Sequence, residues 1–349
     1  MRIAETLLRD AAREILTGLG EEKENAEIAA EILVRSDMRG VSTHGVNLLR
    51  QIVKRKAAAM LSIPTRVEVL REDGSTALLD GRDGLGQVAG YKAMRLSVEK
   101  ALRGGIAMVG VRNTNNVGAL GYYTSTAASS GKVIALCMTN GNPSVAPYGS
   151  ADPFFGTNPI SVGIPLPGAN PIVLDMSSSV VARGKIRLAA LSGEKIPLGW
   201  ACDETGAPTT DPAKALKGSL LPLGGPKGSG LAMVIDILAG LLTGSSYGLK
   251  LKSFHELEGP TGVGATFIAI DIARFMDPGQ FAALVGGYAK EIKALRLQPG
   301  ASEILLPGEV ESIKEEKSRI AGIELPEAVA KAIDEILVKS GSRIRLMAE

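Results

Sequence analysis

The chain has 349 residues, enough for two or three structural units around a substantial core, and 45% of them are hydrophobic. Its net charge of +2 and its aromatic content of 4% give no basis for expecting a nucleic acid or a membrane as partner. The two cysteines, Cys137 and Cys202, form neither a CxxC pair nor a disulfide framework, and we expect no metal site. The N-terminus shows no apolar signal segment, so the sequence predicts a cytoplasmic protein.

Residues 1–60 are predicted to be helical, because apolar residues recur there at helical spacing in three stripes. The third stripe follows Gly45, and we predict Ser42 or Thr43 as the N-cap of its helix. His44, one of two histidines in the chain, is then placed in the first helical turn. The positive end of the helix dipole favours a neutral imidazole, which can accept a proton from an alcohol.

From about residue 65 the pattern changes to strands. The strand-like runs are 66–70, 76–79, 106–111, 133–138, 160–164, 172–174 and 265–270. Helical patterns fall at 87–103, 118–129, 228–243 and 278–295, and again in the tail at 310–340. Several strands follow one another without a helix between them, so we expect an α/β fold with a central mixed or largely antiparallel sheet. The predicted domains are a helical one, formed by residues 1–60 together with 290–349, and an α/β one of residues 61–289.

Two glycine-rich loops precede helical patterns. The loop at 84–90 has GxGxxxG spacing, one residue longer than the dinucleotide fingerprint, so an ordinary tight turn is the favoured interpretation. The loop at 224–230 carries Lys227, and its amides can point at an anion, which favours a bound phosphate of a cofactor. It lacks the Walker A spacing, which disfavours nucleoside triphosphate chemistry. A solvated lysine at a glycine-rich helix entry is the alternative for this loop.

Four clusters of uncharged polar residues lie beside strands, at 113–118, 139–143, 155–160 and 174–179. Each cluster alone is more often turn chemistry, since Asn and Ser bond their own backbone. Four of them at strand ends predict a shared cleft for a ligand set with amide, ribose and carboxylate groups. We place Thr139, from the second cluster, among the cofactor contacts.

Together these segments resemble one family, the malate/L-lactate dehydrogenase-like oxidoreductases, whose nucleotide-binding domain is not a Rossmann fold. The resemblance runs through nearly the whole chain. The segments that carry it are Asp37–Gly40, Thr43–Gly45, Gly118–Tyr123, Phe155–Ile160, Leu174–Met176, Gly224–Gly228 and Pro307–Glu309. It implies NAD or NADP as cofactor and a small carboxylate substrate that is oxidised or reduced at its 2-position. It also implies a homodimer with the cleft partly built between subunits.

The resemblance also assigns roles to individual residues. It makes His44 the proton donor or acceptor, with Thr43 in the place of a family serine that orients it. The substrate-side positions are Arg183, Gly184, Thr157 and Asn116. The positions that match cofactor contacts are Asn116, Val117, Gly118, Ala119, Leu120, Asp175, Met176, Ser177, Lys227, Gly228, Pro307, Gly308 and Glu309. Lys185 is a further catalytic candidate, since it stands where imino acid reductases of the family carry an aspartate; this favours a hydroxy acid substrate.

Two departures from the family bear on the substrate. Many members have a histidine at the position of Asn116 and an arginine at that of Leu48, and the arginine would hold a carboxylate through two hydrogen bonds. We expect Arg183 to replace it, and we expect His255, which has no partner motif, to be structural. Two alternatives stay open: a reductase of a cyclic imino acid, and a cofactor-binding homologue with lost or changed activity. The sequence decides neither NAD against NADP, nor the substrate, nor the direction.

Overall fold

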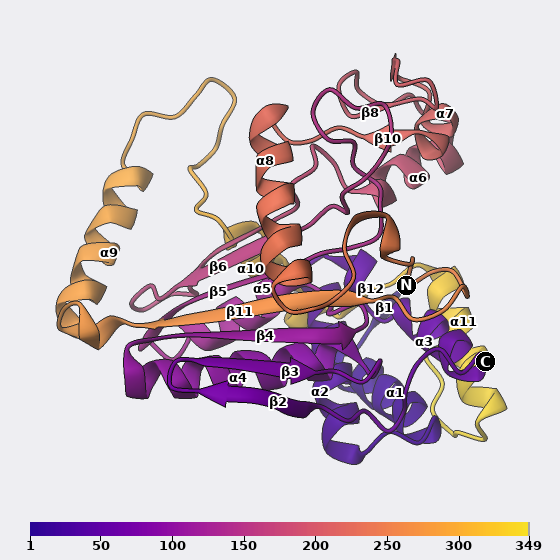
Figure 1. Ribbon diagram of the computed structural model, residues 1–349, viewed down its shortest axis with the longest axis horizontal. Coiled ribbons are helices and arrows are strands. Elements are labelled where there is room, and N and C mark those ends of the chain that lie inside the picture. Colours follow the sequence, from indigo (N-terminus) through magenta and orange to yellow (C-terminus); the bar gives the residue numbers. More distant parts are fainter. Residues whose placement is uncertain (348–349) are drawn as a thin grey trace.

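The centre of the molecule is a seven-stranded sheet with the order β2-β3-β4-β11-β5-β6-β7, shown in the computed structural model of Figure 1, which describes residues 1–347. Its strands are β2 (Glu68–Asp73), β3 (Thr76–Asp80), β4 (Ile106–Thr114), β5 (Val133–Thr139), β6 (Ile160–Ile164), β7 (Ile172–Met176) and β11 (Val263–Asp271). The pair β3–β4 is parallel, and the other neighbouring pairs are antiparallel. The predicted α/β class with a mixed, largely antiparallel sheet is confirmed.

Helices cover both faces of this sheet. Strand β11 shows the arrangement, because successive side chains of a strand point to opposite faces. Phe267 packs edge-on against Tyr123 of α5 (Leu120–Ala128), with ring centroids 5.4 Å apart, and α4 (Gly86–Gly104) lies on the same side. Thr266 instead donates a hydrogen bond of 2.9 Å to the carbonyl of Leu238 on the other side. Leu238 belongs to the π-helical turn η2 (Asp236–Leu241), which continues α8 (Pro226–Ile235). A strand buried on both faces explains why 265–270 is almost continuously apolar.

A helical layer is built from both ends of the chain. It contains α1 (Glu5–Gly18), α2 (Lys23–Met38), α3 (Leu48–Ala57), α10 (Glu309–Ala321) and α11 (Glu327–Lys339), and Figure 1 shows the two termini on the same side of the molecule. Strand β1 (Arg2–Ile3) pairs antiparallel with β12 (Ile323–Glu324), which joins the two ends directly. Outside this layer, α9 (Pro278–Lys293) and the short 3-10 turns η3 (Gly248–Lys250) and η4 (Ile272–Arg274) flank β11 in the sequence. The division at residues 60 and 290 stays a prediction.

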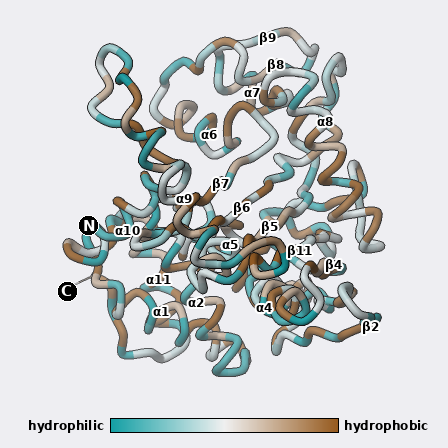
Figure 2. The backbone as a smooth tube through the Cα atoms, turned by 90° about the vertical axis from the view of Figure 1, so that its left-hand side faces the viewer, coloured by the Kyte–Doolittle hydropathy of each residue, from teal (hydrophilic) through white to brown (hydrophobic). Residues whose placement is uncertain are grey.

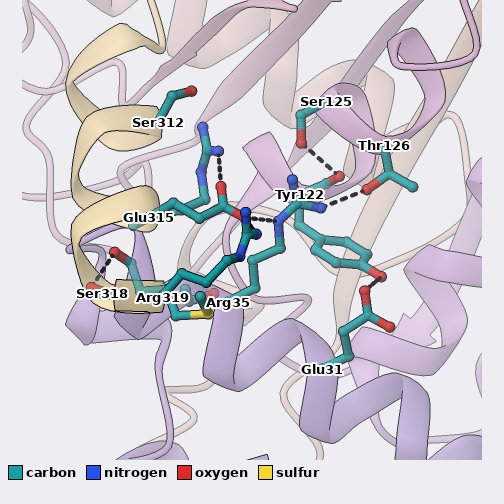
Figure 3. Close-up of polar contacts among 12 residues, drawn as sticks. Glu31, Arg35, Tyr122, Ser125, Thr126, Ser312, Glu315, Ser318 and Arg319 are labelled. Atoms are coloured by element: carbon teal, nitrogen blue, oxygen red, sulfur yellow. Dashed lines mark hydrogen bonds and ion pairs between the residues drawn. The ribbon is translucent and has the colours of Figure 1, made fainter. Parts of the chain in front are cut away.

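Helices α2 and α10 are held together by the carboxylate of Glu315, at the centre of Figure 3. It accepts hydrogen bonds from Arg35 Nε at 2.9 Å and from Arg39 Nη1 at 2.7 Å, both from α2. Arg35 also donates to Thr126 Oγ1 of α5 at 3.2 Å and lies over the ring of Tyr122 at 5.5 Å. Because these groups are largely shielded from water, the ion pairs are far less screened than exposed ones.

A smaller unit with its own core lies at one end of the molecule in Figure 2. It contains α6 (Arg183–Ser192), α7 (Pro212–Lys217) and a three-stranded sheet of β8 (Ala201–Cys202), β9 (Pro208–Thr209) and β10 (Ser219–Leu220). Val145, Ile186 and Leu220 are among its buried residues. Strands of two residues carry no readable pattern, so the sequence did not predict this unit. Within residues 1–347, no helix has both the length and the apolar character needed to cross a membrane.

Candidate active site

A cleft of about 1150 Å³ brings together segments from all parts of the chain. Each of the four polar clusters contributes to its lining, as do the short helix η1 (Ser42–His44), the start of α6 and the turn before α10. The predicted site residues that line it are Thr43, His44, Asn116, Val117, Gly118, Ala119, Leu120, Thr139, Thr157, Asp175, Met176, Ser177, Arg183, Gly184, Pro307 and Gly308. One shared cleft therefore contains most of the residues proposed from the sequence.

Four predicted site residues are not part of this lining, and their roles stay predictions. Lys185 and Lys227 have exposed side chains on α6 and at the start of α8. Gly228 is buried, and a Cβ there would lie 2.4 Å from the backbone of Leu223, so close packing alone requires a glycine. Glu309 accepts a hydrogen bond from Leu306 N at 2.7 Å and pairs with a lysine of α9, so it stabilises the turn before α10.

The segment around His44 differs from the predicted helix start. His44 ends a 3-10 turn, Gly45 is extended with φ −87° and ψ −162°, and α3 begins only at Leu48 with Asn47 as its N-cap. The prediction that His44 lies in the first turn of this helix, capped by Ser42 or Thr43, is therefore wrong. His44 sits instead on a short loop between α2 and α3, open to the cleft.

The cause is Asp37, near the end of α2. Its Oδ2 accepts a hydrogen bond from Val46 N at 2.7 Å, and a Cβ at Gly45 would lie 2.0 Å from its Oδ1. The carboxyl group thus occupies the space beside Gly45 and connects the His44 loop to α2 through this hydrogen bond. Burial raises the pKa of Asp37 to about 7, and the hydrogen bond from Val46 opposes this shift. Sequence reasoning missed this residue, although Asp37 stands in the motif that carries the family resemblance.

The imidazole of His44 is neutral over the physiological range. Loss of water contact lowers its pKa to about 4; a side-chain hydrogen bond with Asn116 opposes the shift, and the nearby charge of His255 adds to it. Its buried Nδ1 has no hydrogen-bond partner within residues 1–347. The neutral ring expected from the helix dipole is found, but desolvation is its cause. A neutral imidazole that lines a cleft can accept a proton.

A positively charged region lies in the same cleft as His44. It is formed by Arg183 and Arg187 of α6, and His255, which the sequence led us to regard as structural, lines the same cleft. Burial lowers the pKa of Arg183, and the charge of Arg187 lowers it further. Burial and then Arg187 lower the pKa of His255, while Glu256 raises it. Arg183 and Arg187 lie about one turn apart on α6, and both line the cleft together with His255. Leu48, by contrast, is a core residue with 3% exposure and is no part of the lining.

The other part of the cleft fits a dinucleotide. Its lining at residues 116–120 leads into the N-terminus of α5, where backbone N–H groups and glycines leave room for a close ligand. Gly121 N donates to Asp175 Oδ2 at 2.7 Å, and burial raises the pKa of Asp175 to about 6. A carboxyl group of this kind suits a ribose hydroxyl. Within residues 1–347, no cluster of three or more His, Cys, Asp or Glu side chains could hold a metal ion.

Comparisons with known proteins agree with this geometry. The family model described as malate/L-lactate dehydrogenase matches residues 3–334. The chain is 39% identical to the malate/(S)-sulfolactate dehydrogenase of Methanothermus fervidus, over 92% of this chain and 93% of that one. The structure of sulfolactate dehydrogenase from Methanocaldococcus jannaschii is similar with a TM-score of 0.93 and 35% identity, over 99% and 98% of the two chains.

A second similar structure is named for a different activity. It is the delta1-piperideine-2-carboxylate reductase of Pseudomonas syringae pvar. tomato, with a TM-score of 0.87 and 29% identity, over 96% of this chain and 99% of that one. The family match across nearly the whole chain, together with these likenesses, shows that the protein belongs to the malate/L-lactate dehydrogenase family.

Proposed function

We propose that the cleft catalyses direct hydride transfer between NAD or NADP and a 2-hydroxy or 2-oxo acid, with His44 as the proton carrier. The chain is an NAD(P)-dependent oxidoreductase of its family, and relatives carry either NAD(+) or NADP(+) in their names. The observation that supports the proposal most is the neutral imidazole of His44, in one cleft with the arginines of α6. A proton acceptor beside an anion site is what oxidation of a hydroxy acid requires.

Each of the chain's groups has one task in this proposal. In oxidation His44 accepts the hydroxyl proton, and in reduction it returns a proton to the developing alkoxide. Arg183 donates one hydrogen bond to Leu216 O at 2.5 Å and has further N–H groups for the substrate carboxylate. Residues 116–120, Asp175 and the Pro307–Gly308 turn would hold the cofactor, which supplies the hydride acceptor or donor when bound.

The charges of the cleft favour a substrate with two acidic groups. Arg183 and Arg187 on α6 present two guanidinium groups to the cleft, which one substrate carboxylate does not neutralise, while Glu256 and Glu258 belong to the 251–259 part of the lining. The relatives named for malate and for sulfolactate act on 2-hydroxy acids that carry a second acidic group. We therefore propose a dianionic 2-hydroxy acid as substrate. The piperideine-carboxylate reductase supports the alternative of a cyclic imino acid, which has a single carboxylate.

A substrate panel with the wild-type enzyme and His44→Ala tests the proposal. Malate, sulfolactate, lactate and Δ1-piperideine-2-carboxylate are each assayed with NAD(H) and NADP(H). We expect turnover of a dianion, and a loss of about 10²- to 10⁴-fold in kcat for His44→Ala. The affinity of the variant for NAD(P)H, measured by fluorescence, should stay unchanged. Faster reduction of the imine would favour the ketimine reductase, and cofactor binding without any turnover would favour the inactive homologue. Normal turnover in His44→Ala would refute the role of His44.

We also propose that the protein is a homodimer. The outer face of α8 and η2 exposes five large apolar side chains in a short stretch, visible as brown segments in Figure 2. These are Met233, Val234, Ile237, Leu241 and Leu242. Apolar patches of this kind mark contact surfaces. Light scattering coupled to gel filtration should give twice the mass of one chain.

The free thiols of Cys137 and Cys202, both buried, support the further proposal of a cytoplasmic location.

A further inference from the structure

One wall of the cleft is an irregular segment, residues 251–259, between η3 and β11. Seven of its residues line the cleft: Leu251, Lys252, Ser253, Phe254, His255, Glu256 and Glu258. Apart from its turns, the segment forms neither helix nor strand, so no ladder of backbone hydrogen bonds fixes its shape. Contacts with the body of the protein must therefore hold it in place.

Arg55 of α3 supplies those contacts. Its side chain has 0% exposure, and all its hydrogen-bond acceptors are main-chain carbonyls. Nη1 donates to Glu256 O at 2.7 Å, and Nη2 donates to Gly259 O at 2.8 Å. The guanidinium carbon also lies 5.3 Å from the centre of the Phe254 ring, which is itself buried. Nη1 also donates to Ser253 O at 3.5 Å, so Arg55 binds the segment before and after His255.

A buried guanidinium is costly unless its N–H groups are satisfied. Here carbonyl groups of the segment accept the shortest hydrogen bonds of Nη1 and Nη2, and they do so only when the segment is folded against α3, while Nε has no partner within residues 1–347. Without the segment the guanidinium of Arg55 loses its acceptors, and without Arg55 the carbonyl groups of Glu256 and Gly259 lose their donor. The conformations of Arg55 and of the segment therefore depend on each other. Arg55 is also on the helix that follows the His44 loop, which links the wall and the proton-transfer site through one rigid element.

This arrangement determines which side chains face the substrate. Phe254 points inward against Arg55, while His255 is exposed on the cleft side. His255 lies close enough to Arg187 and Glu256 for their charges to affect it. Building on the proposed function, we propose that Arg55 is a positioning residue for His255, and that His255 and Arg187 bind the second acidic group of the substrate. His255 would then be a specificity-determining residue for dianions.

Kinetics of Arg55→Met, His255→Gln and the double variant test this inference. With the dianionic substrate of the panel, each single variant should raise KM about tenfold or more, the scale of one charge-assisted hydrogen bond. Their kcat should change less than about threefold, because His44 is untouched. With lactate, which has one acidic group, KM should stay near the wild-type value. The double variant should match Arg55→Met alone, since His255 is already displaced in that protein.

Independent, multiplying losses in the double variant would overturn the inference, and so would an equal loss with lactate. If Arg55→Met does not fold, Gly259→Ala replaces it. Gly259 has φ +126° and open space around it, so an alanine there strains the backbone without a steric clash. The strain should displace the carbonyl group that accepts from Arg55, while Arg55 itself is unchanged. Gly131→Ala, at φ +73° in open space and outside the cleft lining, is the matched control and should behave as wild type. A wild-type enzyme without any turnover would instead contradict the proposed function itself.

Discussion

The pKa of His44 leads to a prediction about the two directions of the reaction. Oxidation of a hydroxy acid by NAD(P) releases one proton, so the ratio of the two kcat/KM values must change tenfold per pH unit. Which direction carries that dependence is decided by the pKa of the proton carrier. With a pKa of about 4 for His44, only about one ring in a thousand is protonated at pH 7. The neutral form needed for oxidation is therefore always present, and the imidazolium needed for reduction is scarce.

The expected profiles follow directly. Between pH 5 and pH 9, kcat/KM for oxidation should be level, while kcat/KM for reduction should fall about tenfold for each unit. An unperturbed histidine would give a different result: both directions would change slope near its ordinary pKa of about 6.5. Initial rates at saturating cofactor, measured in both directions in one buffer series of constant ionic strength, separate the two cases.

Asp37 needs a control in this experiment, since its pKa of about 7 lies inside the range and its carboxyl group touches the His44 loop. The same profiles are therefore measured for Asp37→Asn, which keeps a side-chain oxygen as acceptor for Val46 N and cannot titrate. A change of slope near pH 7 that disappears in Asp37→Asn belongs to Asp37. Asp175→Asn is a second control, because the pKa of Asp175 is about 6. A change of slope between pH 6 and pH 7 in both directions that persists in Asp37→Asn and in Asp175→Asn would refute the desolvation argument for His44.

Three further predictions concern the same loop and the anion site. Burial raises the pKa of Asp37 in the folded state from 3.8 to about 7, so the wild type loses stability as pH rises through this range. Asp37→Asn should therefore gain up to about 4 kcal/mol relative to wild type between pH 4 and pH 8 in urea unfolding, and parallel curves would contradict this. Gly45→Ala should lower kcat at least about tenfold while cofactor affinity holds, because the methyl group displaces the loop; Gly74→Ala, in open space, is its control. Arg183→Met should raise KM by about 10- to 100-fold and Arg183→Lys by less, whereas equal effects would argue against a two-pronged carboxylate contact.

The central sheet was predictable because its strands are long and apolar. All seven predicted runs became neighbours in one sheet, and the helices predicted at 87–103, 118–129, 228–243 and 278–295 also exist, with shifts at their ends. The tail predicted as helical at 310–340 consists instead of two helices, α10 and α11, separated by β12. The pairs β1–β12 and β8–β10 were not predicted, since two residues give no periodicity. The sequence predicted an ordinary helix where the π-helical turn follows α8, because the apolar pattern continues through it without a break.

The candidate site was predictable where a motif marks it, and less so where tertiary contacts shape it. The four polar clusters at strand ends do line one cleft, as predicted. The conformation of the His44 loop depends on a carboxyl group in α2, and no local pattern encodes that contact. His255 reaches the cleft because a buried arginine folds its segment, so neither spacing nor composition could reveal it. Side chains brought in by distant packing are the ones that sequence reasoning missed.

The pairing of β1 with β12 has a consequence for how the enzyme is made. Residues 2–3 find their partners only at 323–324, and α2 meets Glu315 of α10. Because synthesis runs from the N-terminus, the first helices leave the ribosome long before their partners exist, and contacts so far apart in sequence form late. The His44 loop, which is tied to α2, reaches its final support only after α10 has been translated. A polypeptide that ends before α10 should therefore lack activity even though it contains His44.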